Sequence, residues 1–344
     1  MKNALTYITR RCPMRCDYCA IRDSSNLGPE LTPHEWIEAF SILKEIGVDF
    51  NLILGNESWI LGVDLLRIMI RNEVPFAVYT TCPEPFFSNN RDSFFGSKVI
   101  DNLSCGLDYS WEFLKDRKLQ NDMEIKSYRA WKGIRWTREN YPNIDCQGNL
   151  TISKLNYLQI PDIITELTEL GSFSGMNLIH FDKGGFDFFP KKEKLQKFLF
   201  AEEDLPKLQN VIDKVLDNPG KMQHPEIFTD IDLKELVSLN WHCKGDPYGG
   251  PTIDADGSLR CCGYRKGKYT PKFSIFDLPE KLEQWKDAVQ MDASSCPGCA
   301  WSYPRMYHYW KDTNQEFGRR VFVNHAGHHI DKKDWSERTI DGDI

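Results

Sequence analysis

Three cysteines near the start of the chain stand at spacings that suit a metal centre. Cys12, Cys16 and Cys19 lie in the segment RCPMRCDYC, four and three residues apart. Thiolates bind soft metals and iron-sulfur clusters, and three of them in one loop can hold three irons of a cubane while the fourth iron stays open. A zinc ion completed by a distant fourth ligand is the alternative. The sequence therefore predicts a metal centre in this loop.

A second group of cysteines lies toward the other end of the chain. Its members are Cys243, Cys261, Cys262, Cys296 and Cys299. Cysteines clustered at such spacings in a chain of 344 residues indicate metal binding rather than a disulfide framework. Because neighbouring strand residues point to opposite faces, only one of the adjacent Cys261 and Cys262 should bind the metal. The remaining Cys82, Cys105 and Cys146 stand alone and are predicted to be small buried hydrophobic residues.

The elements that must position these cysteines alternate between strand and helix. Short apolar runs are followed by segments with the 3.6-residue period of a helix, which indicates parallel βα units. Thr32 as cap, Pro33 in the first turn and Gly47 at the end mark the first helix. Six strands are too few to close an eight-stranded barrel, so we expect an α/β fold with a partial (β/α)6 barrel. The predicted strands are 4–11, 48–55, 75–82, 97–108, 148–156 and 175–182, and the predicted helices 32–47, 60–72, 122–140 and 160–171.

The second half of the chain has a different character. Asp256 and Gly257 sit at the turn of a predicted β-hairpin, and a helix over 277–290 precedes the Cys296-Pro-Gly-Cys299 pair. We expect a small hairpin and helix domain after the barrel. The predicted divisions are a barrel over 1–182, a mostly helical connector over 183–240, the small domain over 241–311 and a polar tail over 312–344.

The order strand, Cys-x3-Cys-x2-Cys, helix, with Tyr18 just before the third cysteine, resembles the radical S-adenosylmethionine (SAM) enzymes. The resemblance covers roughly residues 4–182. It implies a 4Fe-4S cluster whose fourth iron is chelated by the amino and carboxylate groups of SAM. Reductive cleavage of the sulfonium would release a 5'-deoxyadenosyl radical, which abstracts hydrogen from a substrate.

The same resemblance implies further residues around SAM. Family members carry Gly-Gly-Glu-Pro after the second strand, and here Gly55 and Glu57 match while Asn56 and Ser58 depart from the pattern. Lys126 and Arg129, on the helix over 122–140, could reach a carboxylate, but the expectation is that they lie on a solvated helix face. The predicted SAM-binding residues are Tyr18, Gly55, Asn56, Glu57, Ser104, Asp108, Ser153 and Asn156.

The second cysteine group resembles the SPASM and Twitch domains of radical SAM enzymes. Because no cysteine follows Cys299, the shorter Twitch form with one auxiliary 4Fe-4S cluster is the match. The spacing from Gly257 favours Cys262 as a ligand, and Cys261 stays an alternative. Four thiolates would leave this cluster without an open iron, which suits electron transfer or structure. A four-cysteine zinc ribbon is the competing interpretation.

The substrate should lie between the two clusters, where the carboxyl ends of the strands converge. Candidate catalytic residues there are His180, Asp182 and Lys183, with Tyr248 and Arg265 nearby. We expect hydrogen abstraction from a small polar substrate, in an oxidation whose second electron goes to the auxiliary cluster. Modification or isomerisation of a nucleotide, including a base in nucleic acid, or of a peptide side chain is the alternative, and a non-enzymatic zinc or cluster protein is a third.

Net charge and hydropathy indicate which classes of partner the protein can bind. The formal net charge of -7 disfavours tight binding of nucleic acid, although a local basic rim is not excluded. No stretch of 18 apolar residues is present, and we expect a cytoplasmic protein without membrane association. The family resemblance implies an electron donor of the flavodoxin or ferredoxin type.

Overall fold

The computed structural model places the cysteine groups on one continuous sheet. It describes residues 3–19, 28–48, 50–53, 57, 61, 64, 68, 76–81, 100–184, 189–222, 225–228, 232–243, 245, 249–302, 304–305 and 307–308. The predicted tail over 312–344, Cys82, Tyr248 and nearly all of the predicted helix 60–72 lie outside the described residues. No helix within the described residues is both long and apolar enough to cross a membrane.

Eight strands form this sheet, in the order β6-β5-β4-β3-β2-β1-β7-β8. Strands β1 to β6 are parallel neighbours in chain order, which confirms the predicted partial barrel. Between the edge strands β6 and β8 the described pairing does not close. The strands are β1 (Asn3–Thr6), β2 (Phe50–Ile53), β3 (Phe76–Thr80), β4 (Ile100–Leu107), β5 (Asp145–Ile152), β6 (Phe173–Leu178), β7 (Thr252–Ile253) and β8 (Leu259–Arg260).

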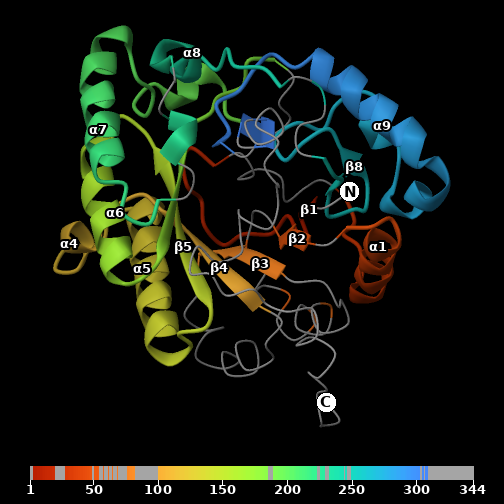
Figure 1. The fold of residues 1–344 in the computed structure, drawn as a ribbon, viewed down its shortest axis with the longest axis horizontal. Coiled ribbons are helices and arrows are strands. Elements are labelled where there is room, and N and C mark those ends of the chain that lie inside the picture. The colour runs from red at the N-terminus through yellow and green to blue at the C-terminus, as the bar shows by residue number, and fades with distance from the viewer. Residues whose placement is uncertain are drawn as a thin grey trace.

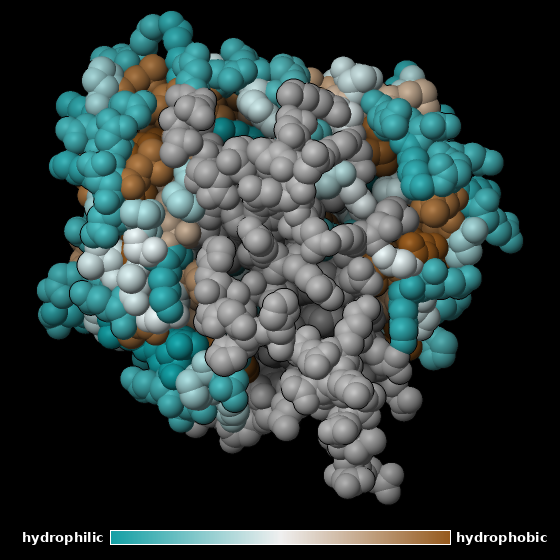
Figure 2. Space-filling model, in the orientation of Figure 1, coloured by the Kyte–Doolittle hydropathy of each residue, from teal (hydrophilic) through white to brown (hydrophobic). Residues whose placement is uncertain are grey.

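Helices cover the outer side of the curved sheet, with α5, α6 and α7 along one flank and α1 and α9 along the other (Figure 1). The rim that these helices present is mostly hydrophilic where residues are described (Figure 2). The α-helices are α1 (Pro33–Glu45), α4 (Trp111–Leu114), α5 (Asp122–Asn140), α6 (Ile160–Glu169), α7 (Leu205–Asp217), α8 (Leu233–Val237) and α9 (Leu278–Ser294). The short 3-10 helices are η3 (Tyr157–Gln159), η4 (Lys192–Leu195), η5 (Glu202–Asp204), η6 (Pro225–Phe228), η7 (Thr270–Lys272) and η8 (Ile275–Asp277).

Local sequence chemistry sets the ends of these helices. At α1 the predicted cap is confirmed: the Thr32 hydroxyl accepts from the Glu35 amide, Glu35 bonds back to Thr32, and Pro33 occupies the first turn. Gly47, with φ of +81°, follows the helix as predicted. In the connector 183–240 the described residues form the α-helices α7 and α8 and the short 3-10 helices η4, η5 and η6.

The apolar core lies between the sheet and the helices. Trp131 and Ile134 of α5 and Leu167 of α6 are fully buried there. Gly148 of β5 lets α6 approach, because a Cβ at this position would lie 2.5 Å from a Leu167 methyl group. Burial of each large apolar side chain contributes about 1.5–3 kcal/mol. Cys105 and Cys146 are buried in this core, as predicted.

The predicted hairpin continues the barrel sheet instead of standing apart from it. Strand β7 pairs with β1 in parallel, with Leu5 opposite Thr252 and Thr6 opposite Ile253, and β8 runs antiparallel to β7. The turn falls at Asp256 and Gly257, where Gly257 has φ of +81°. Since β1 leads into the first cysteine loop and β8 into the second, this pairing leaves only β7 between the strands that carry the two loops.

Candidate functional site

The N-terminal cysteine loop, residues 12–19, follows β1 and is fixed from two sides. The Arg15 amide donates to the Asp122 carboxylate in the first turn of α5 (2.7 Å). The Glu57 amide donates to the Arg11 carbonyl (3.0 Å), which ties the loop to the end of β2. Cys16 is buried, whereas Cys12 and Cys19 are partly exposed.

Beside this loop lies a buried group formed by Tyr18, Asp108 and Lys126. The Tyr18 hydroxyl donates to Asp108 Oδ1 (2.5 Å), and Lys126 Nζ contacts Asp108 Oδ2 (2.7 Å) and donates to the Tyr18 oxygen (2.5 Å). The structure thus brings together two predicted cofactor residues, from the loop and from the end of β4. It adds a lysine that the sequence reasoning had assigned elsewhere.

The prediction that Lys126 lies on a solvated helix face is wrong. The residue is 8% exposed, because its side chain crosses from α5 to the space over Gly106 of β4. A Cβ at Gly106 would lie 3.4 Å from Lys126 Nζ, in ordinary van der Waals contact, so the lysine packs closely over this strand position. The signal in the sequence is the carboxylate of Asp108 at the end of the same strand, which Lys126 binds. Arg129 is partly buried, with Nη1 3.8 Å from the Met14 sulfur.

The electrostatics of this region follow from burial and from the lysine. Burial raises the pKa of Cys12 to about 11 and that of Cys16 to about 12, while Lys126 lowers the latter in part. Burial also disfavours the charge on Lys126, but Asp108 and Tyr18 outweigh it and the pKa of the ammonium stands well above its usual value. Because of these raised pKa values, the thiols of Cys12 and Cys16 stay protonated at neutral pH unless a bound metal displaces the proton.

Glu57 is fully buried beneath the loop. Its carboxylate accepts from the Thr80 hydroxyl (2.6 Å), the Thr81 amide (2.8 Å) and the Thr81 hydroxyl. These bonds join the end of β2 to the end of β3, so Glu57 positions the strands around the predicted SAM site. Gly55 and Asn56 lie outside the described residues.

Asn156 and Ser153 organise the end of β5. The Asn156 side-chain oxygen accepts from the Ser153 amide (2.8 Å) and hydroxyl (3.1 Å), and its nitrogen donates to the Asp108 and Thr151 carbonyls (both 2.8 Å). Asn156 therefore joins the strand ends of β4 and β5. Ser104 is buried on β4 opposite Tyr79 of β3, a residue that the sequence analysis did not single out.

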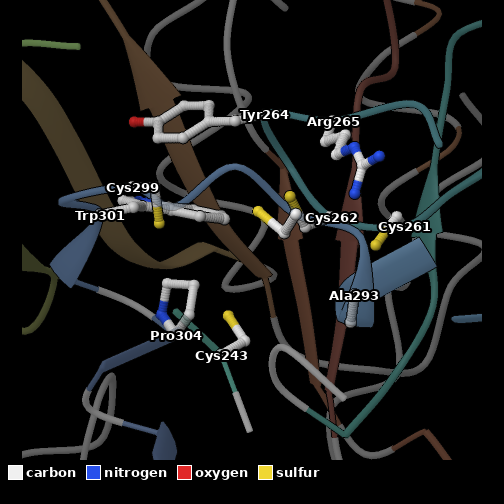
Figure 3. Close-up of a pocket in the computed structure, with 10 residues that line it drawn as sticks. Cys243, Cys261, Cys262, Tyr264, Arg265, Ala293, Cys299, Trp301 and Pro304 are labelled. Carbon is white, nitrogen blue, oxygen red and sulfur yellow. The ribbon is translucent and has the colours of Figure 1, made fainter. Parts of the chain in front are cut away.

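The second cysteine group lines a hollow that is also lined by Tyr264, Arg265, Ala293, Trp301 and Pro304 (Figure 3). We call it the auxiliary cysteine site, formed by Cys243, Cys261, Cys262, Cys296 and Cys299. Among the described residues, no three His, Cys, Asp or Glu side chains are arranged to share a single metal ion. Burial raises the pKa of each of Cys243, Cys261, Cys262 and Cys299 above its ordinary value, to about 11 for Cys262.

Backbone geometry brings the auxiliary cysteines together. The Cys299 amide donates to the Trp241 carbonyl (2.8 Å), so the segments that carry Cys243 and Cys299 run side by side. Gly298 has φ of +100°, and a Cβ there would lie 2.2 Å from the Leu239 carbonyl oxygen. Only glycine fits at this position of the CPGC segment.

Cys261 and Cys262 point in different directions. In Figure 3 the Cys262 sulfur lies on the side of Cys299 and Cys243, whereas the Cys261 sulfur lies apart, beside Ala293 and below Arg265. Cys296 acts electrostatically on both thiols, whereas Asp292 and Arg265 act on Cys261 and Arg260 acts on Cys262. Both cysteines lie in the bend that follows β8, and their side chains leave it in different directions.

The three predicted catalytic residues are held in separate contacts. His180 is 4% exposed, accepts from the Ala300 amide (3.0 Å) and packs against Phe189 and Tyr264. Burial lowers the pKa of His180 to about 4. The Asp182 carboxylate accepts from the Gly184 amide (2.7 Å).

Lys183 and Arg265 also bind the surrounding chain. Lys183 Nζ donates to the Leu239 carbonyl (3.1 Å) and the Asn240 side chain (2.7 Å). The Arg265 guanidinium donates to the Asp292 carbonyl and to the Ser295 hydroxyl (3.2 Å). Among the described residues, these contacts do not assemble the predicted catalytic residues into one acid-base group.

Solved structures of low sequence identity share this arrangement of strands. SuiB of Streptococcus suis, bound to its precursor peptide SuiA, superposes with a TM-score of 0.56 and 15% identity over 86% of this chain and 66% of that one. The native anSMEcpe structure with AdoMet and the Cp18Cys peptide gives a TM-score of 0.55 and 13% identity over 93% and 87% of the two chains. These neighbours are radical SAM enzymes. The chain has the radical SAM fold.

The chain is also similar in sequence to one curated protein. The PqqA peptide cyclase of Bradyrhizobium diazoefficiens is 27% identical over 163 residues, which are 46% of this chain and 41% of that protein. The chain thus spans less than half the length of this relative, and 60% of the SAM-bound SuiB structure. No protein-family model matches the chain. Within the radical SAM fold, the N-terminal cysteine loop stands at the carboxyl end of β1.

Proposed function

We propose that the protein is a radical SAM enzyme that abstracts hydrogen from a peptide substrate. The observation that carries the proposal is the N-terminal cysteine loop on this fold, with a buried Tyr18, Asp108 and Lys126 group against it. Cys12, Cys16 and Cys19 would hold a 4Fe-4S cluster, and three thiols in one loop suit three of its irons. When bound, the cluster and SAM supply reductive cleavage of the sulfonium and a 5'-deoxyadenosyl radical.

The protein residues of this site orient the cofactor. Lys126 and Asp108 fix the Tyr18 ring, and Tyr18 fixes the stretch between Cys16 and Cys19. Asn156 holds the backbone of Asp108, and Glu57 holds the ends of β2 and β3. The loop is therefore preorganised by partners on four strand ends and one helix, which is the condition for holding a reactive group in a fixed geometry.

For the auxiliary cysteine site we propose a second 4Fe-4S cluster, held by Cys243, Cys262, Cys296 and Cys299. Support comes from the thiols that line one hollow with apolar and aromatic neighbours. A cluster with four thiolate ligands suits electron transfer, and it would accept the second electron of a two-electron oxidation of the substrate.

A peptide is the substrate class that the relatives favour. The names of the relatives include a peptide cyclase, SuiB with a precursor peptide and anSMEcpe with a peptide. A small polar molecule is the second candidate.

The test is anaerobic reconstitution followed by metal analysis and product analysis. About eight irons per chain are expected from two cubanes, whereas zinc with little iron would overturn the proposal. With reductant and SAM, the protein should form 5'-deoxyadenosine, and a variant with Cys12, Cys16 and Cys19 changed to Ala should form none while keeping about four irons.

The substrate class is tested with two mixtures under the same conditions, one of short peptides and one of sugars and nucleosides. A peptide that loses two hydrogen atoms for each SAM consumed would support the proposal. Oxidation confined to the second mixture would replace the peptide by a small molecule, and regeneration of SAM would indicate an isomerisation.

A further inference from the structure

A buried carboxylate lies between the two cysteine sites. Asp254, at the end of β7, is 4% exposed and bonds two arginines that are themselves buried, Arg10 and Arg260, at 4% and 0% exposure. Arg10 Nε donates to Asp254 Oδ1 (2.5 Å), and Arg10 Nη2 pairs with Oδ2. Arg260 Nη1 lies 2.7 Å from the same Oδ2 atom.

Each arginine stands two residues before a cysteine of one site. Arg10 leads into Cys12 of the N-terminal cysteine loop, and Arg260 leads into Cys262 of the auxiliary cysteine site. The Arg260 Nε also donates to the Cys262 carbonyl (3.4 Å). The Asp254 carboxylate therefore binds the residues that lead into both sites. Arg10 and Arg260 are far apart in the sequence, and the pairing of β1 with β7 brings them together.

Tyr7 completes this group. Its ring lies under both guanidinium groups, 5.2 Å from Arg10 Cζ and 5.6 Å from Arg260 Cζ, and its hydroxyl donates to the Gly263 carbonyl (2.5 Å). The charges that act on this buried ring include both arginines and the thiols Cys19 and Cys262. Tyr7 thus lies within electrostatic reach of a thiol of each cysteine site, and Arg260 within reach of Cys262.

The group combines charges of both signs. Two guanidinium groups bond the Asp254 carboxylate, and the Glu30 carboxylate, which pairs with Arg11, also accepts from the Arg10 amide (2.6 Å). A buried positive charge stabilises the reduced, more negative form of a nearby iron-sulfur cluster, and therefore raises its reduction potential.

Resting on the proposed function, we propose that Asp254 is a positioning residue shared by both iron-sulfur sites. Through Arg10 and Arg260 it fixes the two cysteine loops relative to one another, and its own negative charge contributes to the potential that both clusters experience. A change at any member of this group then acts on both clusters together, although Arg10 belongs to the barrel and Arg260 to the hairpin.

The test is a redox titration of the reconstituted full chain, followed by electron paramagnetic resonance of each cluster. Asp254→Asn removes the carboxylate charge and keeps the shape, so both potentials should rise. Arg10→Gln removes a cation, so the reduction potentials of both clusters should fall, including the potential of the auxiliary cluster, whose ligands lie in other loops. We expect about a tenfold change in the ratio of reduced to oxidised cluster, which is about 59 mV for one electron.

Two variants separate charge from folding. The double variant Arg10→Gln, Asp254→Asn has the charge of the parent, and its potentials should return toward those of the parent. Asp292→Asn is the matched control, because this fully buried carboxylate of α9 binds the amides of Lys268, Tyr269 and Thr270. It should leave the cluster of the N-terminal cysteine loop unchanged.

A second measurement does not depend on bound clusters. Amide hydrogen exchange on the full chain without metal should be faster in Asp254→Asn than in the parent at both 10–19 and 258–263. A change at one site only, in potential or in exchange, would overturn the inference. Failure of the parent to bind iron would instead overturn the proposed function, and the exchange data would still decide the role of Asp254.

Discussion

At the scale of single residues, neighbouring side chains of the same type have different surroundings. Cys261 and Cys262 are adjacent, yet Figure 3 shows the Cys261 sulfur between Arg265 and Ala293 and the Cys262 sulfur on the side of Cys299 and Cys243. His180 and Lys183 were both expected to face a substrate. The structure places the His180 ring in an aromatic cluster and uses Lys183 to bind the connector at Leu239.

The directions of the two adjacent thiols lead to a prediction on iron content. Cys262→Ser should lose the auxiliary cluster, so that iron falls from about eight to about four per chain, because a cubane needs four thiolates. Cys261→Ser should keep about eight, and it serves as the matched control. Iron and sulfide analysis of both variants after anaerobic reconstitution measures the difference. Equal iron loss in the two variants would contradict the assignment.

Burial of His180 predicts a dependence of stability on pH. Its pKa is lowered from 6.5 to about 4 in the folded chain, so the unfolded chain binds the proton first. The contribution of His180 to the free energy of unfolding is therefore complete above pH 6.5. Roughly 3 kcal/mol of stability is lost as the pH falls toward 4.

The measurement is the midpoint of thermal unfolding between pH 7 and pH 4.5. His180→Gln keeps an acceptor for the Ala300 amide but does not titrate, and it should lose less stability than the parent over this range. If the unfolding midpoints of the two proteins fell equally with pH, His180 would not contribute to the pH dependence of stability.

At the scale of elements, polar side chains at strand ends join one βα unit to the next. Asp108 at the end of β4 binds Tyr18 of the cysteine loop and Lys126 of α5, and Asn156 after β5 binds the Asp108 carbonyl. Glu57 makes the corresponding link between the ends of β2 and β3. The cysteine loop is thus held by contacts that the barrel topology brings together.

The pair of Lys126 and Asp108 predicts a large effect of a single change. Lys126→Met should destabilise the fold by about 3–5 kcal/mol, because it leaves the fully buried Asp108 carboxylate without its cation. The double variant Lys126→Met, Asp108→Asn should recover part of this loss. Urea unfolding of the parent and the variants under identical anaerobic conditions gives the comparison.

A surface ion pair is the control for this prediction. Lys154 pairs with Asp204 at 2.7 Å, with 41% and 13% of the two side chains exposed. Because such a pair is screened by solvent, Lys154→Met should cost less than about 1 kcal/mol. Similar losses at Lys126 and Lys154 would refute the role of the buried pair.

At the scale of the whole molecule, the auxiliary cysteine site depends on the junction of β1 with β7. The Leu5 amide donates to the Pro251 carbonyl and the Tyr7 amide to the Ile253 carbonyl, both at 2.9 Å. Gly250 lies where the two segments meet, and a Cβ there would be 1.7 Å from the Asn3 carbonyl oxygen. The hairpin can therefore pair with β1 only because residue 250 is a glycine and has no side chain.

Gly250→Ala should separate the hairpin from the barrel. We expect faster hydrogen exchange over 251–261 and in β1, with little change in β4 and β5, because the clash is with backbone that cannot move independently. Gly47→Ala is the control: its φ of +81° makes alanine strained, but no atom lies within 4 Å of the added Cβ. Protection of the hairpin in the Gly250 variant equal to that in the control would contradict this account.

The sequence by itself determined the features that are local in the chain. The spacing of Cys12, Cys16 and Cys19 indicated a cluster loop, and the alternation of apolar runs with helical periods indicated a partial barrel, because both patterns are set within a few residues. The capping box at Thr32 and the turn at Gly257 were readable for the same reason.

Only the tertiary structure decided the features that depend on contacts between distant segments. The period of α5 gave no sign that Lys126 is buried, because the carboxylate that binds it, Asp108, follows a strand elsewhere in the chain. Nor could the sequence show that Asp254 binds Arg10, 244 positions away, since a parallel pairing of β1 with β7 leaves no local signature. Burial and charge pairing arise when segments meet, so they belong to the fold and not to any one stretch of the chain.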